Sequence, residues 1–366
     1  MRKALAPLLI TCLLLTGCWD QHELKKLLFV DIVGIDYAGD NRQLKVNFVI
    51  SSLREANQGG GRPSAISYET TGVSLFDAVA NTNKVVPGDL SALETRLYLI
   101  STRFAKDKPL NILNASSQFL SNPLYAHLAV YDGDLSELLS RSKIKDVPVS
   151  DLLMGLLEGE IKRGKIPSNK LLHYILGGTN FINDFALNRF VPSGEGARLA
   201  GLALFSDGRY TGTNLNNEET QLANLMNGAQ GKIQTIVGRM DGSHYSVLVQ
   251  NAKRKFRIVR SGEGINHIEV SLKLDLKIVE EDTELNKHSK DVFKSLEKTI
   301  EEDLTSKAVE VIATLQKANC DYFQLGHEVA AYHPKLYGKM NWRELYPKLR
   351  IKPVIHVNIL NSGILE

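Results

Sequence analysis

The sequence has few cysteines, little net charge and few long apolar runs. Its 366 residues include 3 cysteines and carry a formal net charge of +3. Three cysteines without a CxxC pair argue against both a disulfide framework and a structural zinc site. A nearly neutral chain gives no support to nucleic-acid binding by charge. After the first residues no segment approaches the ~18 consecutive apolar residues of a membrane-spanning helix, which excludes a multi-span membrane protein.

Common catalytic and cofactor-binding motifs are also missing. The sequence has no GxSxG elbow, no complete phosphate loop and no dinucleotide fingerprint. The run Gly59-Gly60-Gly61 is followed by neither GKS nor GKT, so it predicts a plain flexible loop rather than a phosphate cradle. We therefore predict a protein that is not an enzyme and has no cofactor.

Two further groups of residues resemble chemical sites. His327 and Glu328 suggest a zinc-protease motif, but the next histidine is His333, and a gap of six residues turns about 240° on a helix. That spacing is poor for one metal ion, so we predict no metal site. Cys320 is isolated at the end of a predicted helix and is interpreted as a packing residue rather than a nucleophile.

The strongest pattern lies at the N-terminus. Arg2 and Lys3 precede a mostly apolar run that ends at Leu15, which is shorter than the ~20 residues of a spanning helix and typical of an export signal. Leu15-Thr16-Gly17-Cys18 then resembles the bacterial lipobox. The resemblance implies cleavage before Cys18, attachment of S-diacylglycerol to its thiol, and N-acylation of the new amine. The alternative is an unmodified Cys18 after a conventional signal peptide.

Cleavage would change the charge and the thiol content of the chain. Arg2 and Lys3 are lost, so 44 basic residues against 41 acidic ones become 42 against 41, a net charge of +1. Cys320 would be left as the only free thiol. Each buried methylene contributes about 0.8 kcal/mol to membrane affinity, so two acyl chains anchor stably. We expect attachment through lipid rather than through basic residues.

The export signal, the linker composition at 190–196 and the order of predicted elements divide the chain into a signal peptide at 1–17, an N-terminal mixed α/β domain at 18–192 and a C-terminal α+β domain at 198–366. In the N-terminal domain, Ser74 with Asp77 forms a variant of the capping box and predicts the start of a helix. The strands predicted there are 28–36, 43–51, 96–101 and 126–131, and the helices are 74–84, 111–120 and one from Asp134.

The C-terminal domain follows a stretch with linker composition at 190–196. Asp207-Gly208 between apolar runs predicts a hairpin, and Gly228 suits the end of a helix over 218–227. Short strands at 245–249 and 256–259 suggest a subdivision near 245–265.

The last third of the chain has the clearest periodicity. Residues 268–278 alternate strictly between apolar and polar, which predicts a strand with one solvated face. A long amphipathic helix at 290–317 is predicted to cover the adjacent sheet, with Glu301-Glu302-Asp303 on its solvated side. Pro353 places a strand at 351–360 on an edge. The predicted fold class is α+β: a lipid-anchored multidomain body of mixed sheets with packed helices, including a long C-terminal amphipathic helix against an antiparallel sheet.

A series of different short motifs, each present once, is spread along the whole mature chain. They are Cys18-Trp19-Asp20, Val33-Gly34-Ile35-Asp36, Gly72-Val73-Ser74-Leu75, Gly201-Leu202-Ala203-Leu204-Phe205, Asp321-Tyr322-Phe323-Gln324-Leu325-Gly326, Tyr332-His333-Pro334, Trp342 and Asn361-Ser362-Gly363. In this order and spacing the chain resembles the C subunits of spore germinant receptors, the Ger(x)C lipoproteins of spore-forming Gram-positive bacteria. It departs from them at 91–96, which lacks an expected histidine, and at 119–125, which lacks an arginine.

The resemblance implies a non-enzymatic lipoprotein subunit, required for germination, on the outer face of the spore inner membrane. It implies assembly with membrane-spanning A and B subunits into a receptor for nutrients. The alternative is a lipid-anchored extracytoplasmic solute-binding protein or hydrolase with an unrecognised site. Candidate contact surfaces are the solvated strand face at Glu269–Lys277 and the edge strand at 351–360.

Overall fold

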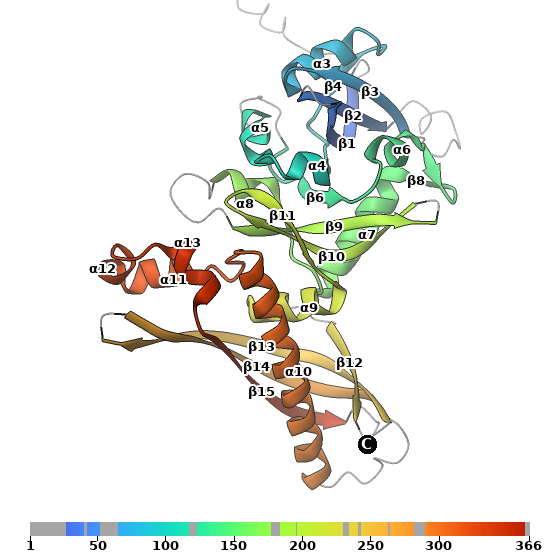
Figure 1. Ribbon diagram of the computed structural model, residues 1–366. Coiled ribbons are helices and arrows are strands. Elements are labelled where there is room, and N and C mark those ends of the chain that lie inside the picture. The colour runs from blue at the N-terminus through green and yellow to red at the C-terminus, as the bar shows by residue number, and fades with distance from the viewer. Residues whose placement is uncertain are drawn as a thin grey trace, which may run out of the picture.

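The computed structural model describes residues 27–39, 42–51, 65–116, 123–176, 184–194, 196–229, 234–240, 243–262, 264–281 and 290–362. Figure 1 shows an elongated α+β molecule in which a large N-terminal sheet and a smaller C-terminal sheet follow each other along the long axis. The predicted α+β class, with mixed sheets and a long C-terminal helix packed against a sheet, is confirmed. Within the described residues, none of the helices has the length and apolar character needed to cross a membrane.

The large sheet has nine strands, in the order β11-β10-β9-β6-β5-β1-β2-β3 with β4 also paired to β1. The central neighbours β1, β5, β6 and β9 run parallel, while both flanks are antiparallel. The strands are β1 (Leu27–Ala38), β2 (Gln43–Ser51), β3 (Ala65–Gly72), β4 (Asp89–Ser91), β5 (Leu97–Ser101), β6 (His127–Tyr131), β9 (Phe185–Ser193), β10 (Gly196–Ser206) and β11 (Arg209–Leu215).

Helices cover both faces of this sheet, so its central strands are buried on both sides. One core lies under α3 (Leu75–Asn83), α4 (Thr102–Ala105), α5 (Pro109–Ser116) and α8 (Leu171–Leu176). The other lies under α6 (Leu135–Ser140) and α7 (Val149–Arg163), beside the small hairpin of β7 (Lys143–Ile144) and β8 (Val147–Pro148).

The predicted helix starts are confirmed by their caps. The Ser74 hydroxyl accepts a hydrogen bond from the Asp77 amide at 3.1 Å, and the Asp77 carboxylate accepts one from the Val73 amide at 2.9 Å. At α6 the Asp134 carboxylate accepts from the Glu137 amide at 2.9 Å. Each bond satisfies a backbone donor that the first helical turn leaves free.

The prediction of an interdomain linker at 190–196 is wrong. β9 and β10 are paired antiparallel strands that turn through this stretch, with Ser193 opposite Gly196. Gly194 has φ +54°, the left-handed conformation that a tight turn requires. Proline and glycine therefore mark a hairpin here, and the sheet of the N-terminal part continues through β11.

The smaller sheet has the order β12-β13-β14-β15, from β12 (Gln234–Met240), β13 (Ser243–Ser261), β14 (Gly264–Glu281) and β15 (Ile351–Ser362). The strands predicted at 245–249 and 256–259 are one continuous strand, β13, so no boundary falls within it. Sequence periodicity was interrupted there by bulges at Ser246/Val247 and Val249/Asn251. β15 lies at the predicted edge, but it runs parallel to β14, so the sheet is mixed rather than antiparallel.

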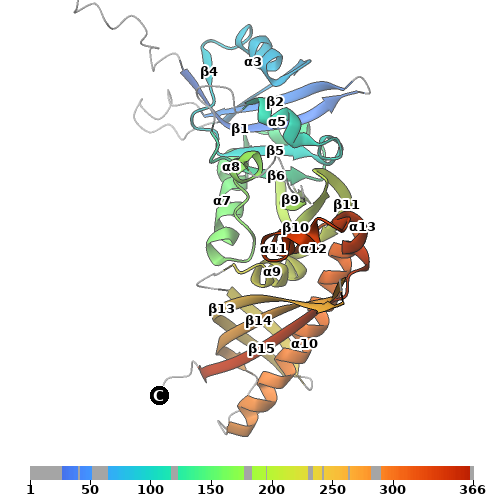
Figure 2. The same cartoon turned by 90° about the vertical axis from the view of Figure 1, so that its left-hand side faces the viewer.

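The long helix α10 (Lys290–Lys317) crosses one face of this sheet (Figures 1 and 2). Its stripe of Leu296, Ile300, Leu304 and Ala308 is buried against the inward residues of β14, as the periodicity predicted. The same core includes residues of β10, β11 and α9 (Asn217–Met226), so the two sheets share it. The chain closes with α11 (Leu325–Tyr332), α12 (Pro334–Tyr337), α13 (Trp342–Leu345) and a 3₁₀ turn at Tyr346–Lys348.

Candidate functional site

Two of the sequence-based candidates, Cys18 and the run Gly59-Gly60-Gly61, lie outside the described residues. Lipid attachment at Cys18 therefore stays a prediction. Cys320 is fully buried beside the carbonyl oxygen of Phe185, at 3.5 Å from its sulfur. Burial raises the pKa of the Cys320 thiol well above its usual value, which removes the thiolate that a nucleophile needs. The interpretation of Cys320 as a packing residue agrees with this position.

The histidines of the zinc-like pattern lie along α11. His327 is in the first turn of the helix, and His333 caps its C-terminal end. No group of three metal-ligating side chains occurs in the described part of the chain.

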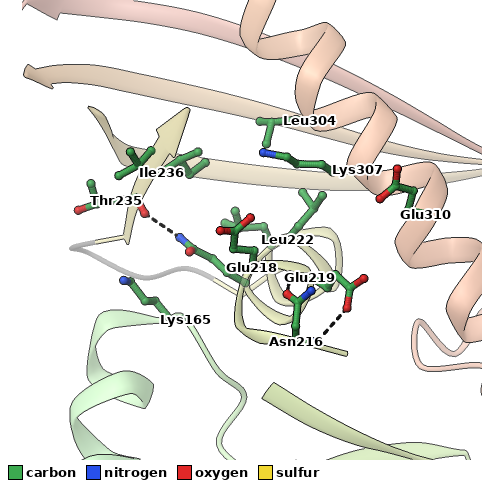
Figure 3. Close-up of a pocket in the computed structure, with 13 residues that line it drawn as sticks. Lys165, Asn216, Glu218, Glu219, Leu222, Thr235, Ile236, Leu304, Lys307 and Glu310 are labelled. Carbon is green, nitrogen blue, oxygen red and sulfur yellow. Dashed lines mark hydrogen bonds between the residues drawn. The ribbon is translucent and has the colours of Figure 1, made fainter. Parts of the chain in front are cut away.

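A cavity of about 310 Å³ lies between α9, β12 and α10, next to the turn that ends α7 (Figure 3). Its apolar floor comes from Leu222, Leu225, Ile236 and Leu304. The charged residues around it are Lys165, Lys307, Glu218, Glu219 and Glu310.

Local hydrogen bonds hold the walls of this cavity in place. Asn216 and Glu219 form a complete capping box at the start of α9, with bonds of 2.9 and 2.8 Å. Gln221 donates to the Thr235 carbonyl of β12 at 3.1 Å. The side-chain amides of Asn224 and Gln234 both donate to the Gly164 carbonyl, at 2.8 and 2.7 Å, and so fix the turn that carries Lys165.

The cavity has the chemistry of a binding site. Cations and carboxylates surround an apolar floor, an arrangement that fits a small amphoteric molecule. The lining contains no histidine, cysteine or serine, and its titratable side chains are those of the glutamates and lysines. Sequence reasoning missed it because its residues come from four separate segments, and only the capping box at Asn216 was visible as a local pattern.

A buried charged cluster joins the large sheet to the C-terminal helices. Asp184, just before β9, accepts hydrogen bonds from the amides of Asp207 and Asp321, both at 3.0 Å. Arg343 of α13 lies 2.7 Å from the same carboxylate. Despite these partners, burial raises the pKa of Asp184 above its usual value. We call Asp184, Asp321 and Arg343 the interdomain cluster.

Asp321 organises the turn into α11. Its carboxylate accepts from the amides of Leu325 and Gly326, at 2.9 and 2.7 Å, and from the Trp342 indole at 3.0 Å. Burial nevertheless raises the pKa of Asp321 to about 6. The motifs quoted around Asp321 and Trp342 therefore meet at one carboxylate.

The acidic side of α10 is not simply a solvated face. Glu301 accepts a hydrogen bond from the Val357 amide, and Glu297 accepts one from the Ile359 amide, each at 2.8 Å. The two carboxylates thus accept hydrogen bonds from backbone amides that would otherwise be unpaired on the open edge of β15. The solvated interpretation of Glu301 is wrong for this reason, and the same bonds argue against the edge of β15 as a contact surface.

Comparison with known proteins finds related sequence families and related whole proteins. Two sequence families match: "Spore germination protein N-terminal domain" over residues 20–188 and "Spore germination B3/ GerAC like, C-terminal" over residues 200–363. Relatives in Bacillus subtilis (strain 168) include spore germination protein KC, 23% identical over 100% of this chain and 97% of its own length. Another is spore germination protein B3, 22% identical over 96% and 95%.

A third relative from the same organism is the putative spore germination protein YfkR, 20% identical over 99% of this chain and 97% of its own length. Among solved structures, the crystal structure of the GerBC protein matches with a TM-score of 0.61 and 15% identity, covering 90% of this chain and 97% of that one. The fold and the two family matches define a two-part protein of the spore germination class. The chain belongs to the Ger(x)C family, which confirms the resemblance found in its motifs.

Proposed function

We propose that this protein is the lipoprotein C subunit of a nutrient germinant receptor, held at the outer face of the spore inner membrane through acylated Cys18. The observation that carries the proposal is the paired family match, which spans both parts of the chain immediately after the lipobox-like Leu15-Thr16-Gly17-Cys18. Acyl chains would confine the body to the membrane plane and raise its effective concentration near membrane-spanning A and B subunits. In this role the protein is not an enzyme.

The proposal is tested by replacing the acceptor thiol. Cys18→Ala in the spore-forming host should leave no lipid on the chain, release the protein from membrane fractions and abolish nutrient-triggered germination. Cys12→Ala is the matched control, because cleavage would remove Cys12 with the signal peptide. Mass spectrometry of the mature N-terminus reports the lipid, and detergent pull-down reports the partners. Normal germination and unchanged pull-down in Cys18→Ala would refute the anchored-subunit role.

A second candidate function, binding of a small solute, is favoured by the cavity between α9, β12 and α10. Calorimetric titration of the mature protein with free amino acids and with sugars tests it. Glu218→Lys and Glu310→Lys change the charge at two exposed lining positions and should abolish any heat that comes from this cavity. Glu302→Lys, on the exposed side of α10, is the control.

A further inference from the structure

The C-terminal sheet has one covered face and one open face. α10 packs on the inner face, which is lined by the buried residues of β14. Figure 2 shows the long helix on the right of the sheet and the opposite, outer face turned to the left. Outward residues of β13, β14 and β15 lie directly opposite one another in the strand register.

The outer face is strongly basic. Between 248 and 259 on β13, 269 and 277 on β14, and 352 and 360 on β15, its outward positions hold six cations and two carboxylates, a net charge of +4. The net charge of the whole chain is only +3. We call five of these residues the basic face: Lys253, Lys255, Lys273, Lys277 and Lys352.

The lysines of the basic face have no ion-pair partner among the described residues. A guanidinium nitrogen of Arg257 lies 2.5 Å from a carboxylate oxygen of Glu269, so these two side chains form an ion pair. Asp275 accepts from the amides of Asn251 and Asn358, at 3.0 and 3.1 Å. These amides, and then the neighbouring lysine charges, hold the pKa of Asp275 below its usual value. Both carboxylates of this face are thus engaged by other side chains.

Two of the lysines oppose each other. Lys253 and Lys273 occupy directly paired positions on β13 and β14, and His356 faces Lys273 from β15. Like charges in opposite register destabilise a sheet. An anionic partner would relieve this repulsion, so the arrangement fits a face that is covered by negative charge.

The position of the basic face relative to the N-terminal end of the chain indicates which anionic partner covers it. In Figure 2 the darkest blue end of the chain, where β1 begins, lies on the left, the side to which the outer sheet face is turned. Only residues 19–26 separate Leu27 from Cys18, a span of at most about 30 Å when fully extended. A membrane that holds lipid at Cys18 would therefore be within reach of the side of the molecule to which the basic face is turned.

We propose that the basic face of β13, β14 and β15 rests on anionic lipid headgroups, so that the protein lies along the membrane with both its parts close to the surface. Clusters of four to eight basic residues bind anionic membranes in this way, and a lipid chain with a basic patch makes a stable double attachment. The inference rests on the proposed anchoring through Cys18, and it adds a basic surface to the attachment that the sequence alone assigned to lipid. An acidic segment of a partner protein is the competing occupant.

The test uses the full lipidated protein in vesicles and an environment-sensitive fluorophore on the outer face. Ser271→Cys places the label between Lys255 and Val354 in the strand register, and Ser295→Cys places it on the exposed side of α10. Vesicles consist of phosphatidylcholine alone or with phosphatidylglycerol, each with a headgroup-attached quencher. Quenching at position 271 should rise at least about threefold on anionic vesicles, while quenching at 295 stays unchanged.

Charge reversal and salt complete the test. Lys253→Glu with Lys273→Glu should abolish the rise, whereas Lys294→Glu with Lys317→Glu on α10 should preserve it. About 1 M salt, which shortens the screening length to about 3 Å, should also abolish it. Equal quenching at 271 on neutral and anionic vesicles would overturn the proposal. A second result would also overturn it: the Lys253/Lys273 variant loses its co-purifying partner proteins, while quenching at position 271 shows no dependence on anionic lipid. That result would assign the face to a protein partner.

The neutral vesicles separate this inference from the lipid anchor. A protein that fails to stay on phosphatidylcholine vesicles lacks the anchor, and the proposed function fails. A protein that stays on both vesicle types without a difference at position 271 keeps the anchor and loses only the docking face.

Discussion

The guanidinium of Arg343 lies 2.7 Å from a carboxylate oxygen of Asp184, although the two residues are separated by almost the whole C-terminal part of the chain. The Asp184 side chain is 3% exposed and the Arg343 side chain 32%, so this ion pair between α13 and the residue before β9 is buried at its carboxylate end. Arg343 also donates to the Ser206 hydroxyl at 2.7 Å. One side chain thus ties the C-terminal helices to the β10–β11 hairpin as well.

Removing this guanidinium should weaken the junction of the two parts. Arg343→Ala leaves the Asp184 charge buried without a cation, and we expect a loss of roughly 3 kcal/mol in the free energy of unfolding. The value lies at the low end for a buried pair because two backbone amides still bind Asp184. Urea denaturation measures the loss, with exposed Arg350→Ala as the control. Coincident midpoints for the two variants would contradict the buried-pair account.

The buried carboxyl of Asp321 should make stability depend on pH. Its pKa of about 6 in the folded protein exceeds the ordinary value, so the folded state binds its proton more tightly than the unfolded state. Its stabilising contribution is complete below about pH 4 and is lost as the pH rises through 6. We expect the stability of the wild type relative to Asp321→Asn to fall by roughly 3 kcal/mol between about pH 4 and 7. Denaturation series of both proteins measure it, and a constant difference would show that Asp321 does not titrate there.

Two glycines should respond in opposite ways to the same substitution. Gly201 in β10 has φ +91°, and an added Cβ would lie 1.9 Å from the Leu215 carbonyl oxygen. Gly201→Ala should therefore prevent folding or cost more than about 4 kcal/mol. An added Cβ at Gly155 in α7 meets nothing within 4 Å, so Gly155→Ala should stabilise by about 0.5–1 kcal/mol. Soluble yield and thermal denaturation compare the two, and a stable Gly201→Ala protein would contradict the geometry at β10.

The glutamates of α10 should protect the edge of β15. Glu297→Ala with Glu301→Ala removes both acceptors from the Val357 and Ile359 amides, and we expect a loss of about 2–3 kcal/mol in total. The exposed edge should also promote self-association. Hydrogen exchange at the two amides and size-exclusion chromatography are the measurements. Glu302→Ala, at an exposed position of the same helix, is the control, and similar exchange rates in both proteins would count against edge protection.

Local patterns predicted much of the fold because they depend on neighbours in sequence. The alternation at 268–278 and the four-residue spacing at 290–317 located β14 and α10. Ser74 and Asp134 marked helix starts, since a cap needs only residues within one turn. The same logic failed at 190–196, where glycine and proline indicate a turn in either a linker or a hairpin and only strand pairing separates the two.

The sequence by itself determined the family, the helices and strands with strong periodicity, and the lipobox-like pattern at Cys18. Only the tertiary structure decided which distant groups meet. The Asp184–Arg343 pair, the glutamates on the edge of β15 and the charged cavity of α9 each join separate segments, and no local spacing encodes such contacts. Charge shows the difference most clearly. Composition gives a nearly neutral chain, but strand register places the lysines of three strands on one open face.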